Sequence, residues 1–168
     1  MVYHRIVDPF PPHPHAIVQS GRILAIDYGS VRMGLAVSDP LGLTAQGLPT
    51  LERTNRQADL GRISQLAADY SVAEVIVGHP ISAKGEDTEM SRRVARFADE
   101  LRAGLGLRVL LWDERLTSLE ADRALKESGA SRGARRRARD RMAAQILLQS
   151  YLDRRAYERE HTPARAEP

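Results

Sequence analysis

Residues 23–38 read ILAIDYGSVRMGLAVS and contain two apolar runs separated by a short polar segment. The apolar run Ile23–Tyr28 is closed by Gly29, which is typical of a buried strand. After a tight turn, Met33–Ser38 forms a second apolar run, so the two runs predict an antiparallel hairpin. Asp27 lies near the end of the first run, where an unpaired buried carboxylate would be costly. Metal binding would satisfy this carboxylate, and so would capping of the turn, which is the simpler interpretation of Asp27 taken alone.

Strands and helices alternate after the hairpin. Apolar runs predict strands at 23–28, 33–38, 43–51, 74–78 and 107–112. Apolar residues at helical spacing predict helices at about 55–70, 90–101, 118–128 and 137–155. Glycines end the second helix at 104 and 106, and Gly129 and Gly133 bracket a loop before the last helix. This order implies an α/β fold with a mixed five-stranded sheet, its first three strands antiparallel, and helices on both faces.

Length and composition limit the possible classes of protein. The chain has 168 residues, 42% of them hydrophobic, and no Cys, which suits one globular domain without disulfides, thiolate metal sites or a Cys nucleophile. The apolar runs are too short to cross a bilayer, and the N-terminal region lacks the continuous apolar segment of a signal peptide. We therefore expect a cytoplasmic domain over 21–155, with a flexible Pro- and His-containing arm over 1–20 and a polar tail over 156–168.

The basic residues are almost all arginine. Counting the sequence gives 23 Arg and 2 Lys against 22 acidic residues, for a net charge of +3. Arg suits bidentate contact with phosphate, although a GC-rich genome would produce the same bias. Six Arg lie within 132–141, around Asp140, which we expect in the first turn of the last helix. Basic residues there oppose the helix dipole, so they indicate an anionic partner; a charge-balanced, solvated helix is the alternative.

A second acidic cluster, Asp113-Glu114-Arg115, directly follows the strand at 107–112. Adjacent residues of a strand point to opposite faces, so Asp113 and Glu114 are not expected to share one role. A solvated turn is the alternative interpretation of this cluster.

Three acidic positions, two at strand ends and one at the start of a helix, could converge on a divalent metal ion. Carboxylate oxygens favour Mg²⁺ or Mn²⁺. Two such ions can stabilise the attacking and leaving oxygens of a phosphodiester. The combination predicts metal-dependent phosphodiester hydrolysis.

Four ordered segments resemble the motifs of the YqgF family, also called RuvX, and together they span about 22–153. They are Ile26–Asp39, Val75–Pro80 with Gly85, Asp113–Ser118, and Asp140–Ala144 with Leu147–Leu152. The resemblance implies a ribonuclease-H-like fold, which Holliday-junction resolvases also use. It further implies a nuclease that matures the 5′ end of precursor 16S ribosomal RNA, with an earlier naming of the family as a Holliday-junction resolvase.

The resemblance also implies roles for individual residues. The catalytic and metal-binding set is Asp27, Glu114 and Asp140, with Asp27 bridging two Mg²⁺ or Mn²⁺ ions, and a role for Asp113 stays open. The expected nucleic-acid-binding residues are Arg32, Arg115, Arg135, Arg136, Arg137 and Arg139. A loop beside the site is expected from Gly78, Pro80 and Gly85, although a plain turn is an equal interpretation. The family often has a Lys shortly before the last acid, where this chain has only Arg.

The expected partner is nucleic acid, either precursor ribosomal RNA or branched DNA, with no membrane partner and a monomer or homodimer. Junction resolution would need a dimer, because two symmetric cuts require two sites. A non-catalytic RNA-binding module of the same fold is another alternative. Asp27-Tyr28-Gly29 also resembles the first phosphate motif of actin-like ATPases and sugar kinases. Those proteins duplicate the fold to enclose ATP, whereas this chain has room for one copy.

Overall fold

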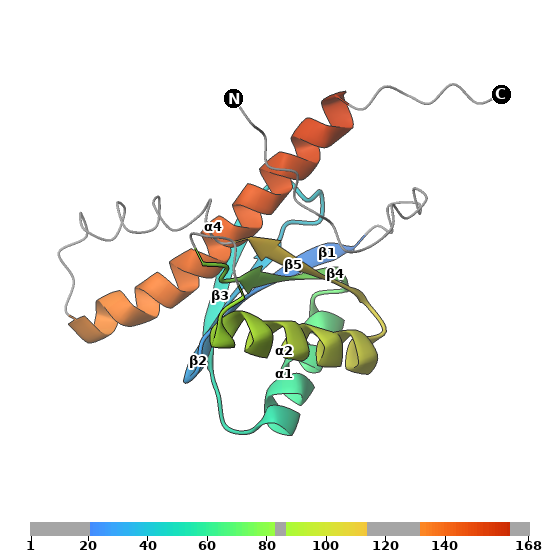
Figure 1. Cartoon of the computed structure of the whole chain (residues 1–168). Coiled ribbons are helices and arrows are strands. Elements are labelled where there is room, and N and C mark those ends of the chain that lie inside the picture. Colours follow the sequence, from blue (N-terminus) through green and yellow to red (C-terminus); the bar gives the residue numbers. More distant parts are fainter. Residues whose placement is uncertain (1–20, 83–86, 114–131, 162–168) are drawn as a thin grey trace.

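A single mixed sheet with helices on both faces forms the protein (Figure 1). The computed structural model describes residues 21–82, 87–113 and 132–161, and within 132–141 it describes the backbone alone. In chain order the described elements are β1 (Arg22–Tyr28), β2 (Arg32–Ser38), β3 (Ala45–Glu52), α1 (Arg56–Asp69), β4 (Val72–His79), α2 (Glu89–Leu105), β5 (Arg108–Asp113) and α4 (Arg132–His161).

The strands follow the order β3-β2-β1-β4-β5 across the sheet. β2 pairs antiparallel with both β1 and β3, whereas β4 pairs parallel with β1 and with β5. The expected mixed five-stranded sheet of ribonuclease-H-like form, with its first three strands antiparallel, is therefore confirmed. Because β1, β4 and β5 are parallel, their C-terminal ends lie at one edge of the sheet.

Side chains of β1 alternate between two hydrophobic cores. Leu24 and Ile26 belong to the larger core, which the buried faces of α1 and α2 complete. Ile23 and Ala25 belong to the smaller core, together with residues of α4. In Figure 1, α4 crosses one side of the sheet and α1 and α2 lie on the other. Burial on both faces explains why β1 is a continuous apolar run and not an alternating one.

Local capping sets the ends of α1 and α2. The Asn55 side chain accepts a hydrogen bond from the Ala58 amide at the start of α1. At the start of α2, Thr88 and Ser91 form a reciprocal capping box. Gly106 ends α2 with φ 63°, a left-handed conformation that glycine adopts at little cost. The helix expected at 118–128 lies outside the described residues.

The last helix differs from expectation at both ends. α4 begins at Arg132 and runs to His161, so Gly133 lies inside the helix and not in a loop. Among the α4 side chains that the structure describes, from Met142 onward, the first buried one is Ala144, and the sequence of 132–141 has no apolar periodicity. The Arg and Ala residues of that segment have high helix propensity, which periodicity does not detect. Apolar spacing therefore underestimated the length of α4.

A buried polar cluster joins α4 to the start of β4. Glu74 is 7% exposed, and its carboxylate accepts a hydrogen bond from the Tyr151 hydroxyl. Arg108 pairs with the same carboxylate at 3.3 Å and Arg155 at 3.9 Å. Burial and the adjacent Glu74 carboxylate raise the pKa of Tyr151 above its usual value, so the hydroxyl stays a donor. This cluster links the second helical layer to the sheet by directional bonds.

Two glutamines connect α4 to the other end of the sheet. Gln149 accepts from the Ala45 amide at 3.0 Å, and Gln145 donates to the Ala45 carbonyl at 3.0 Å. The Trp112 indole donates to the Ser150 hydroxyl at 3.2 Å. α4 is therefore bonded to both edge strands, β3 and β5. Within the described part of the chain, no helix is long and apolar enough to cross a bilayer.

Replacing Tyr151 by Phe tests the Glu74 cluster. The change leaves a buried carboxylate oxygen without its hydroxyl donor, which typically costs about 1–3 kcal/mol. We expect Tyr151→Phe to lower the free energy of unfolding by that amount in urea denaturation. Tyr157→Phe is the matched control, because Tyr157 is 57% exposed and should show almost no change. Equal stability of the two variants would contradict a stabilising role for the cluster.

Candidate active site

Asp27 lies one residue before the end of β1, on the sheet face that α4 covers. Ile23 and Ala25 point into the core shared with α4, and alternation along the strand places Asp27 on their side. The residue is half-buried and has interactions within the protein. The acid is therefore at the C-terminal edge of the parallel strands, where open α/β sheets commonly bind ligands.

Glycines occupy the positions beside Asp27 on both neighbouring strands. Asp27 pairs with Gly34 of β2. On the other side Ile26 pairs with Val77, so Gly78 is the next position in register along β4. Neither neighbour has a side chain, so the backbone can approach a ligand closely at this point of the sheet. The sequence predicts Gly78 at the site, whereas Gly34 appears in it only as part of the first family motif.

The turn after Asp27 also requires a glycine. The Gly29 amide donates to the Arg32 carbonyl at 3.0 Å, which closes the turn between β1 and β2. A Cβ on residue 29 would lie 2.3 Å from that carbonyl oxygen, much closer than side-chain atoms approach a backbone oxygen. The tightness of this turn sets where the end of β1 lies.

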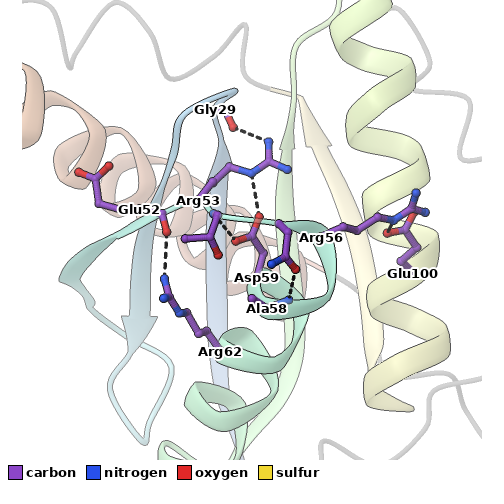
Figure 2. Close-up of polar contacts among 10 residues, drawn as sticks. Gly29, Glu52, Arg53, Arg56, Ala58, Asp59, Arg62 and Glu100 are labelled. Carbon is purple, nitrogen blue, oxygen red and sulfur yellow. Dashed lines mark hydrogen bonds and ion pairs between the residues drawn. The ribbon is translucent and has the colours of Figure 1, made fainter.

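Arg53 binds this turn and Asp59 binds Arg53, and the sequence singles out neither residue (Figure 2). Arg53 donates through Nη1 to the Gly29 carbonyl and through Nε to Asp59, each at 3.0 Å. Asp59 lies in the first turn of α1 and is 1% exposed. The only signal in the sequence is an Arg six residues before an Asp near a helix start, among 23 arginines.

Strand β5 ends at Asp113, the first acid of the third motif. Val109 and Leu111 contact the core beneath α1 and α2, whereas Leu110 and Trp112 contact the core beneath α4. By alternation Asp113 lies on the α1 and α2 side, opposite to the face of Asp27. Glu114 and Arg115 lie outside the described residues. The sequence-based expectation that Asp113 and Glu114 do not share one role stays a prediction, because Glu114 is not among the described residues.

Asp140 lies in α4 but not in its first turn, so that expectation is wrong. The helix begins eight residues earlier, at Arg132. The helix dipole acts mainly within the first turn, so it does not explain an acid at this position. Position 140 is four residues before Ala144 and seven before Leu147, both buried against the sheet, and thus falls on the same helix face. The side chains of Arg135, Arg136, Arg137, Arg139 and Asp140 lie outside the described part.

The predicted phosphate-binding residue Arg32 starts β2 and is mostly buried. Its side chain is 23% exposed, and Nε lies 3.6 Å from a carboxylate oxygen of Glu52, whose side chain is 62% exposed. In the expected site loop, Pro80 directly follows β4, and Gly85 lies outside the described residues. The structure therefore places Gly78 beside Asp27 in register, and Arg32 on β2 two residues from Gly34, the partner of Asp27.

The donor chemistry around Asp27 suits a hard divalent cation. A carboxylate beside glycine backbone offers the oxygen ligands that Mg²⁺ and Mn²⁺ prefer. Among the side chains that the structure describes, no group of three or more His, Asp or Glu could hold a metal ion. Two of the three expected ligands, Glu114 and Asp140, are outside that set. If a metal binds, Asp27 is the described residue that would hold it.

Comparison with known proteins gives one family over most of the chain. Residues 21–154 match the family model of RuvX, described as "Holliday junction resolvase". A protein of Koribacter versatilis, named "Putative pre-16S rRNA nuclease", is 46% identical over 83% of this chain and 92% of its own length. A protein with the same name from Syntrophus aciditrophicus is 45% identical over 79% of this chain and 88% of its own length.

Solved structures resemble the chain more distantly. RuvC of T. thermophilus in complex with a Holliday junction substrate has a TM-score of 0.49 and 17% sequence identity, over 80% of this chain and 96% of that one. A Fowlpox virus resolvase in complex with Holliday junction DNA has a TM-score of 0.44 and 10% identity, over 84% of this chain and 99% of that one.

The steric requirement at Gly29 predicts a large difference between two Gly→Ala substitutions. Gly29→Ala places a methyl group against the Arg32 carbonyl and should destabilise the protein by about 1–3 kcal/mol, as overpacking does. Gly61→Ala is the control, since a Cβ there meets nothing within 4 Å and Gly61 is inside α1. It should stabilise by about 0.5–1 kcal/mol in urea denaturation. A stable Gly29→Ala variant would refute the tight turn.

Proposed function

Because the chain belongs to the RuvX family, we propose that it is a metal-dependent nuclease that processes the 5′ end of precursor 16S ribosomal RNA. The single observation that supports this proposal best is the 46% identity, over 83% of the chain, to a relative named as a pre-16S rRNA nuclease. The position of Asp27 at the C-terminal edge of three parallel strands agrees with it. We also assign the protein to the cytoplasm, where ribosomal RNA is processed in bacteria.

The proposed ligands of Mg²⁺ or Mn²⁺ are Asp27, Glu114 and Asp140. Asp113 faces the α1 and α2 side, so strand alternation favours its neighbour Glu114 for the face of Asp27. Helix periodicity favours position 140, which shares the sheet-facing side of α4 with Ala144. These placements support one acidic set contributed by β1, by the segment after β5 and by α4.

When bound, divalent ions at such a set stabilise the charge that develops on a phosphodiester during hydrolysis. The residues of the chain would bind and orient the nucleic acid. Gly34 and Gly78 let the sugar-phosphate backbone approach Asp27. Arg32 is mostly buried, but its partner Glu52 is 62% exposed and 3.6 Å away, so we expect a phosphate oxygen to replace Glu52 readily. Further phosphate contacts are assigned to Arg115, Arg135, Arg136, Arg137 and Arg139.

Asp27→Asn should abolish metal-dependent cleavage. Loss of an outer-shell partner of a metal site typically costs about 10–100-fold, so loss of a direct ligand should lower kcat by more than about 100-fold. The measurement is cleavage of precursor 16S RNA with Mg²⁺ or Mn²⁺, beside calorimetric titration of the ions. Asp69→Asn is the control, because Asp69 is exposed at the end of α1. If wild type bound neither ion, a non-catalytic RNA-binding module would replace the nuclease proposal.

The two acids after β5 should differ in their effect on cleavage. We expect Glu114→Gln to lose activity and Asp113→Asn to retain most of it, since Asp113 lies on the opposite face of the sheet. Both variants have the same change of charge at adjacent positions, so each is the control for the other. Loss of cleavage in Asp113→Asn, with Glu114→Gln active, would reverse this assignment.

A second candidate activity is cleavage of branched DNA, because the matching family model is described as a Holliday junction resolvase. Symmetric resolution of a four-way junction needs two sites, and therefore a dimer. Size-exclusion chromatography and a competition between four-way junction DNA and precursor RNA distinguish the two substrates. Paired cuts in the junction by a dimer would favour DNA, and cleavage of RNA by a monomer would favour the first proposal.

A further inference from the structure

We propose that Arg53, held by Asp59, fixes the turn that follows Asp27 and so positions the Asp27 carboxylate for metal binding. This inference rests on the proposed function of Asp27 as a metal ligand. Neither Arg53 nor Asp59 belongs to the acidic set or to the expected phosphate-binding residues. The contacts of Arg53, which Asp59 orients, converge on one short segment of chain, residues 28–31.

Arg53 contacts three of the four residues that follow Asp27. Its guanidinium carbon lies 4.4 Å from the centre of the Tyr28 ring, a cation–π arrangement. Its Nη1 donates to the Gly29 carbonyl at 3.0 Å, and its backbone amide donates to the Val31 carbonyl, also at 3.0 Å. Arg53 thus contacts the ring of Tyr28, the last residue of β1, and two backbone carbonyls of the turn.

Asp59 determines the orientation of the guanidinium. One carboxylate oxygen accepts from Arg53 Nε at 3.0 Å, and the other accepts from the Thr54 amide at 3.2 Å. The Asp59 side chain is 1% exposed and the Arg53 side chain is 20% exposed. A planar guanidinium bonded at Nε to a buried carboxylate has little freedom, so Nη1 stays directed at Gly29. Figure 2 shows this connection from α1 through Arg53 to the turn.

Two other arginine–carboxylate pairs, both within helices, lie away from the site. Arg93–Glu89 and Arg154–Glu158 are exposed pairs within single helices. Such pairs contribute little to stability and contact no part of the site. The Arg53–Asp59 pair is mostly buried and bonds to the turn that follows Asp27, so it would act on the proposed ligand through the backbone and not by a direct hydrogen bond.

The strands themselves do not depend on these contacts. β1 and β2 pair from Leu24–Val37 to Tyr28–Met33 through their own backbone ladder. Removal of the guanidinium should therefore loosen the turn and leave the sheet folded. That separation distinguishes a positioning role from a general contribution to stability.

The test compares Arg53→Lys and Asp59→Asn with wild type and with the control Arg93→Lys. Lys keeps the positive charge but lacks the planar guanidinium, which donates to both Asp59 and the Gly29 carbonyl. Asn keeps the shape of Asp59 but replaces the carboxylate oxygen that accepts from Arg53 Nε by an amide N–H₂ or by a neutral amide oxygen. Each protein is measured for Mn²⁺ affinity by calorimetry, for kcat and KM on precursor RNA, and for its melting temperature.

For Arg53→Lys we expect Mn²⁺ affinity and kcat to fall by about tenfold, the usual size for an outer-shell partner, with KM for RNA little changed. Asp59→Asn should show the same pattern, and Arg93→Lys should match wild type. The melting temperature should show that all variants are folded at the assay temperature. Wild-type Mn²⁺ affinity in a folded Arg53→Lys variant would overturn the proposal.

Hydrogen exchange separates this inference from the nuclease proposal. In Arg53→Lys, amides of residues 27–32 should exchange faster, because the turn closed by Gly29 opens more often, while the rest of β1 stays protected. If wild type binds no Mn²⁺, the metal site fails, and the exchange still decides whether Arg53 fixes the turn. Unchanged exchange of 27–32 would overturn the positioning role regardless of the metal result.

Discussion

β1 is buried on both faces, and this burial organises both hydrophobic cores and the candidate site. Leu24, Ala25 and Ile26 are 0% exposed, and Ile23 is 3% exposed, so the middle of the strand excludes any charged group. Asp27 is the acid of β1, and it lies where the coverage of the sheet becomes incomplete. The strand that builds both cores therefore also presents the candidate ligand, at the edge shared with β4 and β5.

Both helical layers combine apolar packing with directional bonds. α1 and α2 pack on the sheet mainly through apolar side chains, and in addition Asp59 of α1 bonds Arg53 and Arg102 of α2 bonds the Val109 carbonyl. α4 adds directional bonds, from Gln145 and Gln149 to β3 and from Tyr151 to the buried Glu74. Removing one partner of such a buried cluster is costly, so these bonds specify how α4 crosses the sheet. Because Asp140 is on α4, its position relative to Asp27 depends on them.

Much of the fold could be predicted because local patterns express it. The hairpin of 23–38, the strands at 74–78 and 107–112 and the glycine end of α2 all agree with the structure within a few residues. The predicted start of α4 was wrong because the Arg-rich segment at its beginning forms a helix although its sequence has no apolar stripe. The prediction that Asp140 lies in the first turn depended on that start and is therefore wrong as well. A pattern of charges alone does not show where a helix begins.

Local sequence patterns were enough to predict the order of elements, the alternation that separates Asp113 from its neighbour, and the four family motifs. Two features came from the three-dimensional packing alone: Gly34 and Gly78 lie on either side of Asp27, and Arg53 joins Asp59 to the turn at Gly29. The physical reason is that periodicity is a local property of the chain. Strand register and the direction of a guanidinium depend instead on residues distant in sequence, which meet only when the sheet and α1 have packed together.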